Sequence, residues 1–131
     1  MVISGDTQAS PAFATAVAGV DVMVHEAQAN ELLRQAQAIM AARGNAWLAK
    51  LLGDIQTYHT MPAEAAGIAN QAGAKLLILT HLTPPLPEFF AEPAFMTEVE
   101  RVRPSGSLLG HDGLMVSLPA GSDRLDITDL K

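Results

Sequence analysis

The chain has 131 residues, of which 49% are hydrophobic and 17% charged, and it contains no cysteine. This length allows one globular domain at most, and the lack of cysteine excludes a disulfide scaffold and a cysteine-based zinc site. The net charge of −6, with eight dispersed basic residues, argues against a nucleic-acid binder. No apolar run reaches the roughly 18 residues of a membrane span. We therefore expect a cytoplasmic protein with no membrane partner, and an upstream signal peptide stays open.

The first half of the chain alternates short apolar strands with helices. A strand end at 2–4 runs into the turn Gly5-Asp6-Thr7, and Ser10-Pro11 is typical of a helix start. The next apolar run is followed directly by His25-Glu26. The remaining elements expected in this half are a helix at 11–18, a buried strand at 20–24, a helix at 27–42 and a helix at 46–52.

The second half begins with a loop that contains Tyr58-His59. Thr60 predicts the N-cap of a helix that has Pro62 at its first position and ends at Gly73. Four consecutive aliphatic residues at 76–79 predict a fully buried parallel strand, and the alternation of strand, helix and strand gives an α/β class.

After that strand the pattern loosens. Four prolines predict an irregular segment at 82–93, which three phenylalanines, Phe89, Phe90 and Phe95, would dock. The elements expected beyond it are a short helix at 95–102, a weak strand at 105–109, a strand at 114–118 and a polar tail at 121–131.

Acidic and histidine residues lie where the predicted strands run out. Such positions suit metal ligands and catalytic groups, because a rigid strand end holds a side chain accurately. Asp6 follows a turn glycine, Glu26 and His81 each follow an apolar strand, and His59 precedes a helix. Each also has a plainer interpretation taken alone: a turn aspartate, ordinary strand-end polarity, or a surface histidine.

Three further polar residues have no assigned role at this stage. His25 shares a strand end with Glu26, so at least one of the two must meet a partner. His111 and Asp112 lie in a compact turn whose chemistry explains them adequately.

Taken together, four segments resemble the carboxyl-terminal half of the metallo-β-lactamase superfamily, and its ribonuclease Z and arylsulfatase-like hydrolase branch in particular. The segments are Ser4-Gly5-Asp6-Thr7, Val22-Met23-Val24-His25-Glu26-Ala27, His59-Thr60 with Glu64-Ala65-Ala66, and Leu77-Ile78-Leu79-Thr80-His81. The resemblance implies half of an αββα sandwich and a metal-dependent hydrolase. In that family pattern Asp6 bridges two divalent metal ions, expected to be zinc, and His81 binds one of them.

The resemblance further implies a hydrogen-bonded pair of Glu26 and His59, with His59 as the proton donor to the leaving group. The substrate would be a small-molecule ester or phosphodiester, cleaved by a metal-activated water. Gln28 stands where ribonuclease Z proteins have a threonine, and 82–85 lacks their polar serine and Arg-Tyr pair. A general hydrolase is therefore the expectation, not a transfer RNA processing enzyme.

The family's His-x-His-x-Asp-His motif has no counterpart in this sequence. Asp6 and His81 alone cannot satisfy two metals that want about four ligands each. We therefore expect residues 1–131 to be a partial domain, inactive alone, whose partner is the missing amino-terminal half. A homo-oligomer stays open. The alternative is a non-catalytic binding domain that uses the exposed sheet face, but such a domain would have no reason to keep Glu26 and His59.

Overall fold

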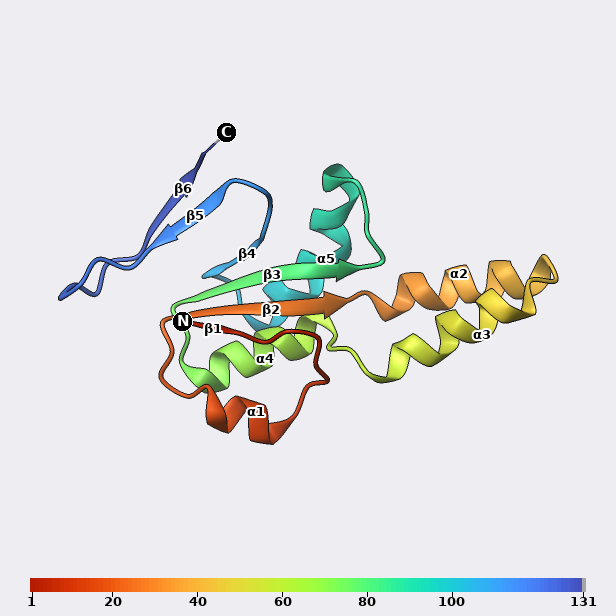
Figure 1. Cartoon of the computed structure of the whole chain (residues 1–131), viewed down its shortest axis with the longest axis horizontal. Coiled ribbons are helices and arrows are strands. Elements are labelled where there is room, and N and C mark those ends of the chain that lie inside the picture. Colours follow the sequence, from red (N-terminus) through yellow and green to blue (C-terminus); the bar gives the residue numbers. More distant parts are fainter. Residues whose placement is uncertain (131) are drawn as a thin grey trace.

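The computed structural model describes residues 1–130 and consists of a parallel sheet with helices on one face and a β-hairpin on the other (Figure 1). The sheet has the strand order β1-β2-β3-β4, and all its neighbouring strands are parallel. Its strands are β1 (Val2–Ile3), β2 (Val22–Gln28), β3 (Leu76–Thr83) and β4 (Ser107–Leu109). The expected α/β class is confirmed.

Three helices cover one face of this sheet: α1 (Pro11–Ala16), α4 (Pro62–Ala72) and α5 (Glu88–Val102). The core between the helices and the sheet is built from alanine-rich helix faces against larger aliphatic and aromatic side chains. Phe95 of α5 is fully buried there, with Met23 and Leu77 from the two central strands. Small alanine faces let the helices approach the sheet closely, which fixes the positions of the loops that follow the strands.

The other face of the sheet is covered in part by a hairpin of β5 (Leu114–Ser117) and β6 (Asp126–Asp129), which pair antiparallel. Val22, Leu76 and Ile78 are buried under it. Three apolar side chains on this side remain 65 to 69% exposed: Met1, Ile3 and Leu130.

Helices α2 (Asn30–Ala42) and α3 (Ala46–Asp54) form an arm that projects from the sheet (Figure 1). They pack mainly against each other, and the short helix η1 (Ile55–Thr57) returns the chain to the sheet. The base of the arm is held by buried Gln28, whose Nε2 donates to Asn30 Oδ1 at 2.7 Å and to the Ile55 carbonyl at 2.8 Å. The arm therefore starts and ends beside the carboxyl end of β2.

Several sequence-based boundaries were wrong. The second strand runs to Gln28, so 27–29 do not open the following helix, and the third strand continues past His81 to Thr83. In both cases the extra residues pair with each other across β2 and β3, an interaction between distant segments that local pattern does not reveal. The predicted polar tail likewise contains β6, which pairs with β5.

The proline-rich segment was also mispredicted, because α5 begins at Glu88 and includes Pro93. A proline removes one backbone hydrogen bond, but Ala91, Phe95 and Val99 recur at helical spacing and are all buried. Phe95 docks as expected, whereas Phe89 and Phe90 are 82% and 58% exposed. In the part of the chain that is described, no helix is long and apolar enough to cross a membrane.

Candidate active site

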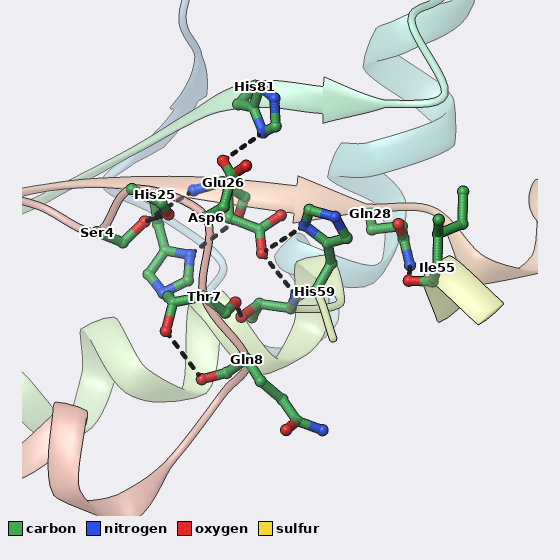
Figure 2. Close-up of polar contacts among 12 residues, drawn as sticks. Ser4, Asp6, Thr7, Gln8, His25, Glu26, Gln28, Ile55, His59 and His81 are labelled. Atoms are coloured by element: carbon green, nitrogen blue, oxygen red, sulfur yellow. Dashed lines mark hydrogen bonds and ion pairs between the residues drawn. The ribbon is translucent and has the colours of Figure 1, made fainter. Parts of the chain in front are cut away.

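The four residues singled out in the sequence converge at one edge of the sheet. Asp6 follows β1, Glu26 lies near the end of β2, His81 lies in β3, and His59 lies between η1 and α4 (Figure 2). Because the carboxyl ends of parallel strands meet at one edge, side chains there can approach one another from distant parts of the chain. The arrangement is a buried pair with an exposed pair beside it.

The buried pair consists of Glu26 and His59, whose side chains are 1% and 12% exposed. Their closest atoms, Glu26 Oε1 and His59 Nδ1, lie 3.2 Å apart, within ion-pair distance, but their orientation falls short of a hydrogen bond. Oε1 instead accepts a hydrogen bond of 2.9 Å from the backbone N–H of Thr60. Among the described residues, Oε2 of Glu26 has no hydrogen-bond partner. A carboxylate held almost dry with one oxygen unpaired costs stability, which is typical of functional sites.

The exposed pair consists of Asp6 and His81. Nδ1 of His81 lies 2.9 Å from Oδ1 of Asp6, and the two side chains are 55% and 65% exposed, respectively (Figure 2). An ion pair this exposed contributes little to folding stability. Its two side chains are nevertheless held together at the rim of the site, where a ligand can reach them.

A β-bulge aims His81 toward Asp6. Glu26 pairs with Thr80 and Ala27 pairs with Leu82, so His81 is the extra residue in β3. Its φ of +45° lies in the left-handed region, the only such value for a non-glycine residue in the described chain. A histidine in this conformation is strained, and bulges commonly redirect a side chain next to an active site. The strained backbone at His81 therefore lowers stability, and it directs this imidazole toward Asp6.

The two pairs are close enough to act on one substrate. The rings of His59 and His81 have centroids 6.2 Å apart, and Glu26, His59 and His81 each offer a ligand atom within 4.8 Å of the others. Tyr58 packs beside His59, with ring centroids 5.2 Å apart. The edge of the sheet thus gathers two imidazoles and two carboxylates from four segments.

The chemistry of these donors fits part of a metal site. A tetrahedral zinc bound at about 2.0–2.1 Å by an imidazole nitrogen and a carboxylate oxygen holds those atoms roughly 3.3 Å apart. Nδ1 of His81 and Oδ1 of Asp6 lie at a similar separation, 2.9 Å. A full zinc site takes about four ligands, so this pair accounts for half of one. The group of Glu26, His59 and His81 is a second candidate set of donors.

His25 does not join the site, although it precedes Glu26. Its ring is fully buried against Phe13, with centroids 5.5 Å apart, and its Nδ1 lies 2.8 Å from the Glu26 carbonyl oxygen. Burial lowers the pKa of His25, and the contact with this carbonyl and the Glu26 charge oppose that effect. Successive side chains of a strand point to opposite faces, which separates this imidazole from the carboxylate beside it. His111 lies in the turn that follows β4, where it contacts the carbonyl of Asp112 at 3.2 Å.

The sequence did not reveal the polar contacts that surround the site. Thr60 was expected to cap α4, but the N-cap is Met61, whose N–H donates to Glu64 Oε2 at 2.9 Å. Thr60 is buried instead. Ser4 Oγ accepts from the backbone N–H of Glu26 at 3.1 Å, which joins the β1 loop to β2. The one available signal was that both are small polar residues next to the candidate motifs.

Comparisons with known proteins bear on the relatives and the fold of the chain. No protein-family model matches the chain. It is 31% identical over 120 residues to a protein named ribonuclease Z from Myxococcus xanthus, covering 91% of this chain and 33% of that protein. It is 35% identical over 83 residues to ribonuclease BN from Erwinia tasmaniensis, covering 63% and 22%. A crystal structure of the metallo-β-lactamase fold protein YhfI from Bacillus subtilis matches with a TM-score of 0.54 and 21% identity, over 83% of this chain and 36% of that one.

In sequence the chain is similar to proteins named ribonuclease Z and ribonuclease BN, and in fold it is similar to a metallo-β-lactamase fold protein. The chain spans about a third or less of the length of the curated relatives it matches. The strand order and the helix-covered sheet therefore correspond to a portion of the metallo-β-lactamase fold, with the four candidate side chains at one edge of it.

Proposed function

We propose that this chain is part of a metallo-β-lactamase-fold hydrolase that cleaves an ester or phosphodiester bond. The observation that carries the proposal is the meeting of Asp6, Glu26, His59 and His81 at one sheet edge. Packing alone does not require this arrangement of side chains. A buried carboxylate with an unpaired oxygen and a strained histidine both lower the stability of the fold.

Asp6 and His81 are the residues that would hold metal in this proposal. Both are exposed at the rim and already lie at a spacing that suits two ligands of one ion. When bound, divalent metals lower the pKa of a coordinated water and polarise the bond to be cleaved. Zinc, manganese or iron would suit a set of imidazole and carboxylate ligands, with zinc as our proposal.

His59 would deliver a proton to the leaving group. Its Nδ1 faces Glu26 at 3.2 Å, which leaves the opposite nitrogen, Nε2, for the substrate. Because Glu26 is fixed by the N–H of Thr60, its carboxylate stays beside the imidazole and would orient the ring toward the substrate. The buried pair and the metal ligands would thus serve the two ends of the same scissile bond.

The relatives widen the class of substrates that the composition indicated. The net charge of −6 argued against nucleic acid, but both curated relatives carry the name of a ribonuclease. We therefore include an RNA phosphodiester among the proposed substrates, beside a small-molecule ester or phosphodiester.

We propose that residues 1–131 form the carboxyl-terminal half of the domain and that the other half supplies the remaining ligands. The face of the sheet beside the β5–β6 hairpin carries exposed Met1, Ile3 and Leu130, and a groove there is lined by Val24 and Ile78. An apolar face of this kind marks a docking surface. The chain matches only a third of the Myxococcus xanthus protein. We therefore propose that the other half of the domain covers this apolar face, and the alternative is that a second copy of this chain covers it.

A chimera tests the proposed function. The segment of the Myxococcus xanthus ribonuclease Z that matches this chain is replaced by this chain, and hydrolysis of bis(p-nitrophenyl) phosphate and of a short RNA is measured with added zinc. We expect hydrolysis that falls at least 100-fold in the His59→Ala and Asp6→Ala variants, since each removes a distinct part of the chemistry.

The matched control is His111→Ala, which alters a histidine to which the proposal assigns no role and should leave the rate unchanged. A chimera that folds and binds metal but hydrolyses neither substrate would contradict the proposal and would favour a non-catalytic binding domain. Sedimentation of the chain alone reports whether a second copy covers the apolar face.

A further inference from the structure

Thr60 is a buried residue in the middle of the polar contacts around the site. It is 0% exposed, although it lies in the loop between η1 and α4. All of its polar groups have partners on other segments. The N–H donates to Glu26 Oε1 at 2.9 Å, the carbonyl accepts from the Gln28 N–H at 2.8 Å, and the hydroxyl donates to the Thr7 carbonyl at 2.6 Å.

Thr60 is linked in this way to three of the four proposed functional residues, Asp6, Glu26 and His59. Thr7 follows Asp6, Glu26 is itself one of the four, and His59 directly precedes Thr60 in the chain. Thr60 lies 53 residues from Thr7 and 34 residues from Glu26 along the chain, and it bonds to both. The bonds therefore connect the Asp6 turn, strand β2 and the His59 loop.

The Asp6 turn has few other anchors. Strand β1 consists of two residues, and Asp6 is 65% exposed. Apart from Thr60, the polar contacts of the described residues that leave this turn are the exposed Asp6–His81 ion pair at 2.9 Å, the exposed bond from Gln8 Nε2 to the Thr57 carbonyl at 3.1 Å and those of Ser4 with β2. The Thr60 hydroxyl makes the shortest of these bonds, 2.6 Å, and it is partly buried, which strengthens it relative to an exposed bond.

We propose that Thr60 is a positioning residue that couples the Asp6 turn to the Glu26 and His59 pair. Its N–H holds the Glu26 carboxylate beside His59, and its hydroxyl holds the backbone next to Asp6 at a fixed place relative to that pair. The inference deepens the proposed function, on which its catalytic meaning rests, whereas the coupling itself is a property of the folded chain.

The hydroxyl can be removed without disturbing the two backbone bonds. Thr60→Val keeps the shape and leaves the partly buried Thr7 carbonyl without its donor, which is unfavourable. Thr60→Ser keeps the hydroxyl and loses only a methyl group. A role in packing would make the serine variant the more disturbed of the two, whereas a positioning role predicts that serine restores the wild-type behaviour.

The test is ¹H–¹⁵N NMR of the 131-residue chain and the two variants. We expect Thr60→Val to shift the amide resonances of residues 5–7 and to lower their heteronuclear NOE, with the amides of the β2–β3 core unchanged and Thr60→Ser like the wild type. Unchanged resonances at 5–7 in Thr60→Val would overturn the proposal. So would equal loosening of the whole chain in both variants.

A zinc titration of the same samples separates this inference from the proposed function. We expect the zinc concentration that half-shifts the Asp6 and His81 resonances to rise at least threefold in Thr60→Val and to be unchanged in Thr60→Ser. If zinc moves no resonance in the wild type but Thr60→Val still loosens the turn, the coupling stands and the metal assignment fails. If both variants bind zinc like the wild type, the positioning role is refuted.

Discussion

Buried His25 makes the stability of the chain depend on pH in a direction that can be derived from the structure. Burial lowers its pKa below the ordinary value of 6.5, so near pH 6 the folded chain binds fewer protons at this site than the unfolded chain does. The stability that comes from keeping the ring neutral is therefore present above the unfolded pKa of about 6.5. It is lost as the pH falls below that value.

The size of the effect has an upper limit. Below the unfolded pKa each pH unit removes at most about 1.4 kcal/mol from the free energy of unfolding. Between pH 7.5 and 5.5 the loss from His25 is consequently limited to on the order of 1 kcal/mol, because the unfolded histidine is half protonated near 6.5. The carbonyl of Glu26 and its charge oppose the shift and reduce this limit.

The assay is urea unfolding of the wild type and His25→Gln at pH 7.5, 6.5 and 5.5. We expect the wild type to lose more stability than the variant over this range, although the variant is less stable at pH 7.5. The three remaining histidines are common to both proteins, so their contribution cancels in the difference. His111→Gln is the control and should keep the wild-type slope. Equal slopes for wild type and His25→Gln would refute the reasoning.

Three more predictions concern single positions. Phe95→Ala should lower the free energy of unfolding by about 3–5 kcal/mol, since Phe95 is fully buried. Phe89 is 82% exposed, so Phe89→Ala should change the free energy of unfolding by less than about 0.5 kcal/mol. Urea unfolding midpoints of the two variants test this difference. The His81→Gly variant should be more stable than His81→Ala by about 1 kcal/mol, because glycine is unstrained at a positive φ. A calorimetric measurement in which His81→Ala is the more stable variant would contradict this. Trp47, the single tryptophan, is 73% exposed, so its fluorescence emission should stay at the wavelength of a hydrated indole on unfolding; a large red shift would place it in a buried environment.

The residues of the candidate site could be found in the sequence because each follows a local pattern. Runs such as 76–79 identify buried parallel strands from composition alone, and the polar residue just beyond such a run falls at the carboxyl edge of the sheet. Asp6, Glu26 and His81 share this relation to their strands. His59 was singled out by its place just before a helix start, and the family resemblance then implied its pairing with Glu26 and its role as proton donor.

The details of the site depend on contacts that no local pattern encodes. His81 is held by a bulge, which arises from the register between β2 and β3. Thr60 has the sequence signal of a helix cap, but its hydroxyl meets the carbonyl of Thr7, 53 residues away. Pro93 argues against a helix locally, yet burial of Phe95 and Val99 favours one. In each case tertiary packing overrides a local preference.

The central claim is that Asp6 and His81, next to Glu26 and His59, are part of one metal site. The most direct measurement is the NMR spectrum of the histidine rings and backbone amides during addition of zinc, which detects even the weak binding expected of two ligands. We predict shifts confined to these four residues and their neighbours, and their loss in the Asp6→Asn, His81→Gln double variant. Shifts centred on His111, or a double variant that responds like the wild type, would contradict the account.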